Sequence, residues 1–371
     1  MSPGGDVAVI GGGLIGLAIA FELAERGATV RLYDRDEPAR AASWAGAGML
    51  APYTERVADE ELLQLCEDSL AEYPPFVERV REASGVDPQL HLNGIVHAAF
   101  DEVALERLRE HGDALRSRGV TCDLLDRAHV LAVEPWLAHH VAGGLLVAGE
   151  GHVDNRRLGR ALVAACAARG VSFARVASLR VECDTRRALG VRTNVGFTPA
   201  VAVVNACGAW SSLLDGVPPE MLPAVEPIKG QMLALQVPDA FVRRATWVPD
   251  AYVVPRDDGR LLVGATSERA QFDMRVTAEG LHRLLHAVLQ AAPSLAAFTV
   301  TETWTGLRPG TADGRPFLGP TPLEGLYVAT GHYRNGILLA PATARLLADA
   351  VCGNAAPELA AFSLPRRKRA S

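Results

Sequence analysis

Cysteine is scarce in this sequence, and no two cysteines stand at the C-x-x-C spacing that zinc sites and redox motifs use. Six cysteines are spread along the chain, most of them beside Ala, Val or Leu: Cys66, Cys122, Cys166, Cys183, Cys207 and Cys352. This pattern excludes a small domain stapled by disulfides. The cysteines are predicted to be buried apolar side chains in a protein of a reducing compartment.

Long apolar runs and extended basic faces are missing too. No segment approaches the roughly 20 apolar residues that span a bilayer, and the N-terminus lacks the charged and apolar regions of a signal peptide. The formal net charge is -6, and the one basic run, residues 366–369, stands at the C-terminal end, where we expect a solvated tail. We therefore expect a cytoplasmic enzyme of small molecules, with no nucleic-acid and no membrane partner.

Two common catalytic signatures are also absent. His139, His140 and the other histidines lack a metal-ligand spacing with cysteines or acids, so no metal site is predicted. No G-x-S-x-G sequence is present to carry a nucleophilic serine. The 371 residues, of which 49% are hydrophobic, are nevertheless enough for about two domains with a sizeable core.

A glycine-rich turn near the N-terminus carries the first positive signal. The apolar residues 7–10 lead into GGGLIG, a nearly all-apolar stretch that ends at Gly27, and a second apolar run. This order predicts strand, turn, helix and strand, the first βαβ unit of a doubly wound sheet. In such a turn Gly11 permits the tight bend, Gly13 lets backbone approach a pyrophosphate, and Gly16 lets the helix pack on the strand.

Asp34 ends the second strand 18 residues after Gly16, near the about 20 expected for the acid that binds a ribose. The N–H groups near Leu14 and Ile15 would hold the phosphates. A glycine triplet alone could be a loop that needs positive φ angles, but strand, helix and acid together favour a dinucleotide. The acid disfavours NADP, and NAD and FAD both remain open at this point.

The rest of the chain alternates helices and strands. A charged helical stretch at residues 62–84 is predicted to break at Pro74–Pro75, where a proline ring clashes with the preceding turn and an N–H is lost. A helix is predicted from Asp154, its N-cap, to Gly170. The apolar residues 200–206 then have the pattern of another strand of the nucleotide-binding sheet.

Extended segments rich in Val, Leu and Tyr are predicted to form an antiparallel sheet around a substrate cavity: residues 230–237, 251–255, 260–266 and 300–307. A helix is expected near residues 278–292. Closer to the C-terminus, a strand at residues 325–330 and a buried helix at residues 337–351, with Pro341 in its first turn, would return to the nucleotide-binding sheet.

Six motifs occur in the order GGGLIG, AGAGMLAP, AYVVPR, LLVGATSE, TWTGLRPGTADGRPFLG and GHYRNGILLAP. The small residues of the second would let backbone lie against a flat ring or a pyrophosphate. In order and spacing the motifs resemble the glycine oxidase family of thiamine biosynthesis, within the D-amino-acid oxidase and sarcosine oxidase superfamily. The resemblance covers nearly the whole chain and implies FAD. It also implies non-covalent binding, since sarcosine oxidases attach the flavin to a cysteine near the position of Gly306 here.

The glycine turn and the resemblance together assign the cofactor contacts. These residues are Gly11, Gly13, Leu14, Ile15, Gly16, Asp34, Arg35, Ala42, Ser43, Ala47, Gly48, Met49, Val176, His332, Tyr333, Arg334, Asn335, Gly336, Ile337 and Leu338. A helix beginning near Asn335 would also point the positive end of its dipole at the cofactor, which favours acceptance of a hydride.

Three residues are assigned to the substrate by the resemblance. Arg308 matches the residue that pairs with the substrate carboxylate, Arg334 a second arginine near it, and Tyr252 a tyrosine that bounds the pocket. A guanidinium presents a planar fork of donors that fits a carboxylate and keeps its charge when partly buried. No side chain is assigned as a catalytic acid or base, because the Cα hydrogen can leave as hydride.

The implied activity is FAD-dependent oxidative deamination of glycine and related small amines, including sarcosine and small D-amino acids. The products would be the 2-oxo acid, ammonia or an amine, and hydrogen peroxide from O2. A homo-oligomer, often a tetramer, is implied as well. Ser267 stands where some glycine oxidases carry Met, and residues 268–274 look locally divergent, which leaves the pocket size open.

Several alternatives stay open. A D-amino-acid oxidase, or a dehydrogenase of the same fold that passes electrons to a quinone or partner protein, would carry the same motifs. A non-catalytic nucleotide-binding protein would not need Arg308, Arg334 and Tyr252, and an NAD-dependent dehydrogenase would leave GHYRNGILLAP unexplained.

The predicted fold class is α/β with an α+β substrate part, in which a Rossmann-like FAD-binding domain is interleaved with an antiparallel-sheet substrate-binding domain. The FAD-binding domain would comprise residues 1–85, 150–215 and 305–365. Residues 86–149 and 216–304 would form the substrate-binding domain, and residues 366–371 a basic tail.

Overall fold

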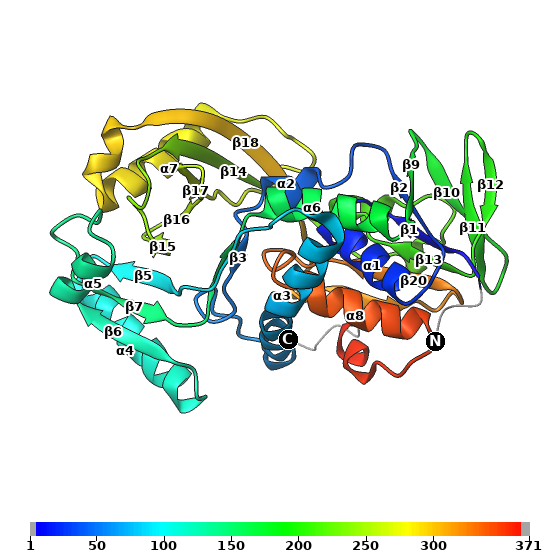
Figure 1. Cartoon of the computed structure of the whole chain (residues 1–371), viewed down its shortest axis with the longest axis horizontal. Coiled ribbons are helices and arrows are strands. Elements are labelled where there is room, and N and C mark those ends of the chain that lie inside the picture. The colour runs from blue at the N-terminus through cyan, green and yellow to red at the C-terminus, as the bar shows by residue number, and fades with distance from the viewer. Residues whose placement is uncertain (1–4, 365–371) are drawn as a thin grey trace.

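The computed structural model describes residues 5–364 and contains a mostly parallel six-stranded sheet at one end of the molecule (Figure 1). In sheet order its strands are β19 (Phe317–Pro320), β20 (Leu326–Thr330), β13 (Ala202–Asn205), β1 (Val7–Ile10), β2 (Val30–Asp34) and β9 (Ser172–Arg175). All neighbours run parallel except β19 and β20. Strands from distant parts of the chain therefore meet in one sheet, as the apolar runs predicted.

The side chains of β1 alternate between two cores, because successive residues of a strand point to opposite faces. Val7 and Val9 belong to a large core beneath helices, whereas Ala8 and Ile10 belong to a second core. The helices are α1 (Leu14–Glu25), α3 (Glu60–Ser84), α6 (Asn155–Ala168) and α8 (Ala340–Val351). The second core lies under a small meander of β10 (Leu179–Cys183), β11 (Ala188–Thr193) and β12 (Gly196–Pro199).

An eight-stranded sheet occupies the other end of the molecule (Figure 1). In sheet order its strands are β18 (Thr299–Gly310), β14 (Glu226–Gln236), β17 (Arg260–Gly264), β16 (Ala251–Pro255), β15 (Ala245–Val248), β5 (Ile95–Ala99), β7 (Gly143–Val147) and β6 (Cys122–Asp126). Only β15 and β5 pair in parallel. The associated helices are α4 (Glu102–Ser117), α5 (Arg127–Val133) and α7 (Ala278–Ala291). The antiparallel arrangement predicted for residues 230–307 is confirmed.

Short elements connect the two sheets. They are the helix α2 (Ala41–Ala45) and a small sheet in which β8 (Gly151–Val153) lies between β3 (Met49–Leu50) and β4 (Leu90–His91). Single turns of 3-10 helix lie at Gly208–Leu213, Pro219–Met221, Pro293–Ala297 and Pro357–Phe362. The fold class is therefore α/β with an antiparallel sheet, as predicted, while the boundaries of the two proposed domains stay a prediction.

The predicted break at Pro74 and Pro75 is wrong, since α3 continues through both residues. The two prolines are exposed, so the carbonyl groups that they leave unpaired lie on the solvent side of the helix. Their neighbours Tyr73 and Phe76 are buried, and the Tyr73 hydroxyl donates to the carbonyl of Ile337 at 2.8 Å. Packing on both sides of the prolines therefore keeps the helix in one piece.

The start of α8 is also different from the prediction. The helix begins at Ala340 rather than at Ile337 or near Asn335, and Pro341 takes an early position where its missing N–H costs nothing. Residues 335–339 instead form a turn, in which Leu339 N donates to the Asn335 carbonyl at 2.8 Å. The positive end of the helix dipole therefore lies at Ala340, five residues after the expected start near Asn335.

Two predicted helices are confirmed by their caps. Asp154 accepts a hydrogen bond from Arg157 N at 2.9 Å at the start of α6, and Gly170 follows its end with φ +80°. Thr277 caps α7 through Gly280 N at 3.1 Å. No helix among residues 5–364 is both long enough and apolar enough to cross a membrane. The predicted basic tail lies outside the described residues.

Candidate active site

A cavity of about 590 Å³ lies between the two large sheets and is lined by segments from both. Most residues that the sequence assigned to cofactor and substrate line it: Gly13, Leu14, Ile15, Ala42, Ser43, Ala47, Gly48, Met49, Tyr252, Arg308, His332, Tyr333, Arg334, Asn335, Gly336 and Ile337. The fold therefore brings together residues that are up to about three hundred positions apart in the sequence.

Six assigned residues do not line this cavity: Gly11, Gly16, Asp34, Arg35, Val176 and Leu338. Gly11 and Gly16 are needed for the close packing of the turn itself. A Cβ on Gly16 would collide with the Gly11 carbonyl, and one on Gly11 with the Ala206 carbonyl. Gly11 also has φ +107°, which L side chains rarely adopt. The two glycines thus let β1, the turn and α1 approach one another closely.

Asp34 lies beside the glycine turn at the end of β2. Its Oδ2 accepts from Gly12 N at 2.6 Å and its Oδ1 from Asp36 N at 3.0 Å. The buried residue Val176 donates its N–H to the Asp34 carbonyl at 2.8 Å. Arg35 stacks on the Trp210 ring, with its guanidinium carbon 4.5 Å from the ring centroid. These residues form one cluster at the carboxyl edge of β2 and β9, next to the cavity.

The segment from Ser43 to Ala47 is held in place by bonds to its carbonyl groups. Asn155 Nδ2 donates to the Ser43 carbonyl at 2.7 Å, and Arg256 Nη2 donates to that of Ala47 at 2.7 Å. Trp304 Nε1 donates to the Ala45 carbonyl at 2.9 Å. A wall of small residues is thus fixed without a large side chain entering the cavity.

Glycines in other parts of the cavity wall expose backbone of the kind that a flat cofactor needs. A Cβ on Gly208 would meet no protein atom within 4 Å, and one on Gly336 would meet only His332 Cβ at 3.5 Å. Side chains at these positions would stand in the cavity. Leu14 N, at the start of α1, donates to the Ser43 hydroxyl at 2.8 Å, so this N–H is already paired within the protein. The bare backbone at Gly208 and Gly336 lies in the same cavity as the N-terminus of α1, and this combination fits FAD, whose phosphates bind at helix N-termini.

Neither a cysteine nor a group of metal ligands is found in the described part of the site. The cavity wall, as the structure describes it, contains no cysteine. Gly306 lies against α2, where a Cβ would collide with that of Ala45. Within residues 5–364 no three His, Cys, Asp or Glu side chains are grouped so that they could hold a metal ion.

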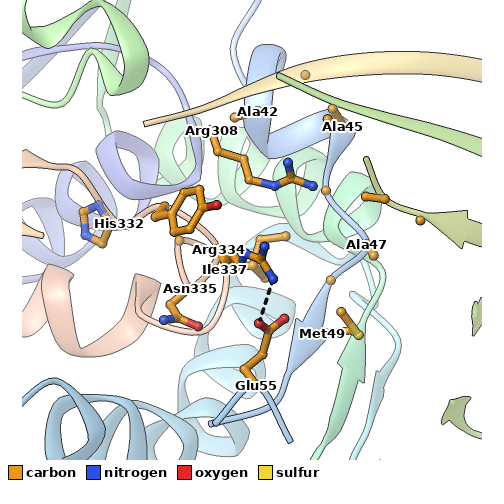
Figure 2. A pocket seen from close by; sticks show the side chains of 18 of the residues that line it. Ala42, Ala45, Ala47, Met49, Glu55, Arg308, His332, Arg334, Asn335 and Ile337 are labelled. Carbon is orange, nitrogen blue, oxygen red and sulfur yellow. Dashed lines mark ion pairs between the residues drawn. The ribbon is translucent and has the colours of Figure 1, made fainter. Parts of the chain in front are cut away.

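Arg308 reaches from β18 into the cavity (Figure 2). Its Nη1 donates to the Thr266 carbonyl at 3.1 Å, which orients the guanidinium. Tyr252, on β16, lies nearby, and a Cβ on Gly264 would be 2.6 Å from its hydroxyl. Burial raises the pKa of Tyr252, while the charge of Arg308 opposes that rise, so the phenol is protonated at neutral pH.

Arg334 enters the same cavity from the loop before α8 and pairs with Glu55 at 3.7 Å between Nη1 and Oε2 (Figure 2). Burial raises the pKa of Glu55, and the charges of Arg334 and Arg308 oppose that rise. Glu55 is not predicted from the sequence, because nothing in its neighbourhood marks it as more than a residue of a surface turn. Only the fold carries it to the two arginines.

The ring of His332 turns toward α8, where Nε2 lies 3.1 Å from the hydroxyl of Thr343. Burial lowers its pKa to about 3, so the imidazole is neutral at physiological pH. Tyr333, the next residue, has φ +48°, an uncommon conformation for a non-glycine residue. His332 can therefore contact a ligand in the cavity through its backbone, rather than act as an acid through its side chain.

The divergent loop at residues 268–274 is anchored by a buried lysine and by a ring contact. Lys229, only 1% exposed, lies 3.7 Å from Glu268 and 3.6 Å from Asp273. The ring of Phe272 stacks on Trp210 at 5.6 Å between centroids. Ser267 lies 3.4 Å from the Tyr333 hydroxyl. Residues 267–274 do not line the cavity itself, where this part of the wall ends at Thr266.

Comparison with known proteins gives a consistent result. The family model described as FAD dependent oxidoreductase matches residues 6–350. A glycine oxidase of Geobacillus kaustophilus is 37% identical, with 97% of each chain covered. A bifunctional protein ThiO/ThiG of a Synechocystis strain is also 37% identical, but the chain spans only 54% of its length. A crystal structure of the Geobacillus kaustophilus glycine oxidase superposes with a TM-score of 0.91 at 36% identity, with 98% of each chain covered.

Proposed function

Because the chain belongs to the FAD dependent oxidoreductase family, we propose that it oxidises glycine and related small amines, including sarcosine and small D-amino acids. The products would be the 2-oxo acid, ammonia or an amine, and hydrogen peroxide. One observation carries this proposal: Arg308, Arg334 and Tyr252 line the same cavity as the glycine turn and the small-residue segment around Ala47.

When bound, FAD supplies the acceptor for a hydride from the substrate Cα and passes the electrons to O2. The side chains of the protein bind the substrate and orient it. Arg308 pairs with the substrate carboxylate, and its bond to the Thr266 carbonyl fixes the direction of the fork. Tyr252 bounds the pocket and can donate its hydroxyl to the same carboxylate.

No side chain is needed to remove a proton from carbon. The substrate reacts as the neutral amine, and the imine that results is hydrolysed by water to the 2-oxo acid. Glu55 forms an ion pair with Arg334 and balances the charge of that arginine inside the cavity. We assign the cofactor contacts to the cavity-lining residues named above other than Arg308 and Tyr252, with Asp34 and Val176 on the side of the adenine nucleotide.

The likeness to ThiO/ThiG proteins supports a role in forming the thiazole of thiamine, although the chain spans only about half the length of those relatives. We further propose a homo-oligomer, by family resemblance. A cytoplasmic location is supported by the six cysteines, none of which is paired in the described residues.

The test is to purify the protein, record the flavin spectrum, and measure peroxide in aerated buffer with glycine, sarcosine, D-alanine and D-proline. We expect a yellow protein that forms peroxide with glycine. Substrate-dependent reduction of a quinone or dye without peroxide would identify a dehydrogenase instead. A protein that takes up no FAD would contradict the whole proposal.

A further inference from the structure

A second cavity, of about 390 Å³, adjoins the proposed active site, and the reaction described above makes no use of it. Four residues line both cavities: Glu55, His97, Trp247 and Arg334. The outer part of the wall contains Arg56 and Arg107, both exposed side chains. We call this second cavity the vestibule, since it shares part of its wall with the active-site cavity and also includes exposed side chains.

The vestibule has two cations without a counter-ion. Within residues 5–364, neither guanidinium has an ion pair or a hydrogen bond: Arg56 stands in the turn after β3, with φ +54°, and Arg107 stands on α4. Arg109, two positions along the same helix, pairs with Glu106 at 3.1 Å and does not line the vestibule. Unpaired arginines at a cavity are available to an anionic ligand.

The other ionisable groups of the wall do not cancel this charge. Glu55 faces Arg334. His97 is neutral at physiological pH, because burial and the nearby charge of Arg56 lower its pKa to about 4. The vestibule therefore carries an excess positive charge next to the site where the substrate amine is proposed to react.

We propose that the vestibule is a second anion subsite, which receives a carboxylate carried on the nitrogen substituent of an N-carboxyalkyl glycine. Iminodiacetate is the smallest member of this class. The inference rests on the proposed amine oxidation: one carboxylate pairs with Arg308, and the nitrogen substituent extends past the shared wall toward Arg56 and Arg107.

The chemistry balances without a new reactant. Iminodiacetate would lose a hydride from one Cα to FAD and the proton of its nitrogen to solvent, which gives an imine. Water would convert that imine to glyoxylate and glycine, while O2 would take the two electrons and become hydrogen peroxide. The released glycine is itself a proposed substrate.

Binding can be tested without turnover, using the FAD-loaded protein and ligands that contain no amine. Diglycolate has the shape of iminodiacetate with an ether oxygen, and isobutoxyacetate replaces its second carboxylate by an uncharged group of the same shape. Calorimetric titration should show tighter binding of diglycolate. Arg56→Ala and Arg107→Ala should each reduce that preference about threefold to fivefold, as expected for exposed charge pairs, and the double variant about tenfold or more.

Arg109→Ala is the matched control, because it removes an arginine from the same helix outside the vestibule, and it should leave the preference unchanged. Higher ionic strength should weaken the preference of the wild type and barely affect the double variant. Equal binding of the two ligands by the wild type, or a preference that is as large in the double variant as in the wild type, would overturn the subsite.

Kinetics then separate this inference from the proposed function. A protein that oxidises glycine but shows no diglycolate preference keeps the function and loses the subsite. A protein that prefers diglycolate through Arg56 and Arg107 but oxidises no amine keeps the subsite and loses the function. If both hold, the ratio of kcat/KM for iminodiacetate to that for N-isobutylglycine should fall in the double variant by the same factor as the binding preference.

Discussion

The guanidinium of Arg308 occupies the space that a side chain on Gly230 would fill. A Cβ on Gly230 would lie 2.6 Å from Arg308 Nη2 and 2.7 Å from its Cζ, closer than real Cβ atoms approach other atoms. In the paired strands β14 and β18, Gly230 faces Gly306, two positions before the arginine. The absence of a side chain at Gly230 is thus what allows Arg308 to lie flat across the strand.

Gly230→Ala should therefore displace Arg308 without touching the substrate directly. We expect KM for glycine to rise by about tenfold or more, with FAD content unchanged, because the carboxylate clamp depends on the orientation of the guanidinium. Steady-state kinetics and the flavin absorbance of the purified variant provide the measurement. An unaltered KM would show that the arginine can take another productive position.

Arg308→Ala removes the arginine that is proposed to pair with the substrate carboxylate. The loss of a charge-assisted, two-pronged pair should cost about 3 kcal/mol of substrate binding, or roughly a hundredfold in KM. The variant should still bind FAD, and Arg308→Lys should restore only part of the lost affinity, since a lysine lacks the planar fork. Wild-type glycine kinetics in Arg308→Ala would remove this residue from the substrate site.

Asp34→Ala tests the part of the site that is proposed to hold the adenine nucleotide of FAD. Asp34 holds the glycine turn through Gly12 N and is proposed to bind the ribose of FAD. We expect weaker FAD binding by about tenfold or more, seen as a lower ratio of flavin to protein absorbance, which added FAD partly restores. Asp36→Ala, an exposed neighbour on the same loop, serves as the control and should purify with full flavin.

The buried carboxyl group of Glu150 should make the free energy of unfolding decrease as pH rises. Burial raises its pKa from 4.5 to about 7, although bonds from Thr54 and Tyr53 oppose that rise. A group whose pKa is higher in the folded state favours folding at low pH, and this contribution is lost as pH rises from about 4.5 to about 7. The difference corresponds to about 3 kcal/mol.

Glu150→Gln should remove this dependence, since an amide can accept the same backbone N–H groups and donate to the Thr54 hydroxyl. Thermal unfolding at pH 5 and pH 8 is the measurement. Relative to the wild type, the Tm of the variant should be higher by several degrees at pH 8, and the advantage should shrink at pH 5. A constant difference between the two pH values would indicate that Glu150 does not titrate in this range.

Local sequence patterns were sufficient for the secondary structure around the glycine turn. The strand before it, the helix after it and the second strand are all found as predicted, because turn glycines and apolar runs act through the adjacent backbone. The two helix errors have the opposite origin. Pro74 and Pro75 are tolerated because Tyr73 and Phe76 pack into a core that no local pattern shows.

The residues of the candidate site show the same difference between local and tertiary determinants. The sequence by itself determined the dinucleotide turn and, through its motifs, the FAD-dependent family, the two arginines and Tyr252. Only the tertiary structure placed Glu55 against Arg334, left Gly230 bare beneath Arg308, and opened the vestibule between Arg56 and Arg107. Backbone turns depend on neighbouring residues, whereas these contacts join strands and loops that meet only when the chain folds.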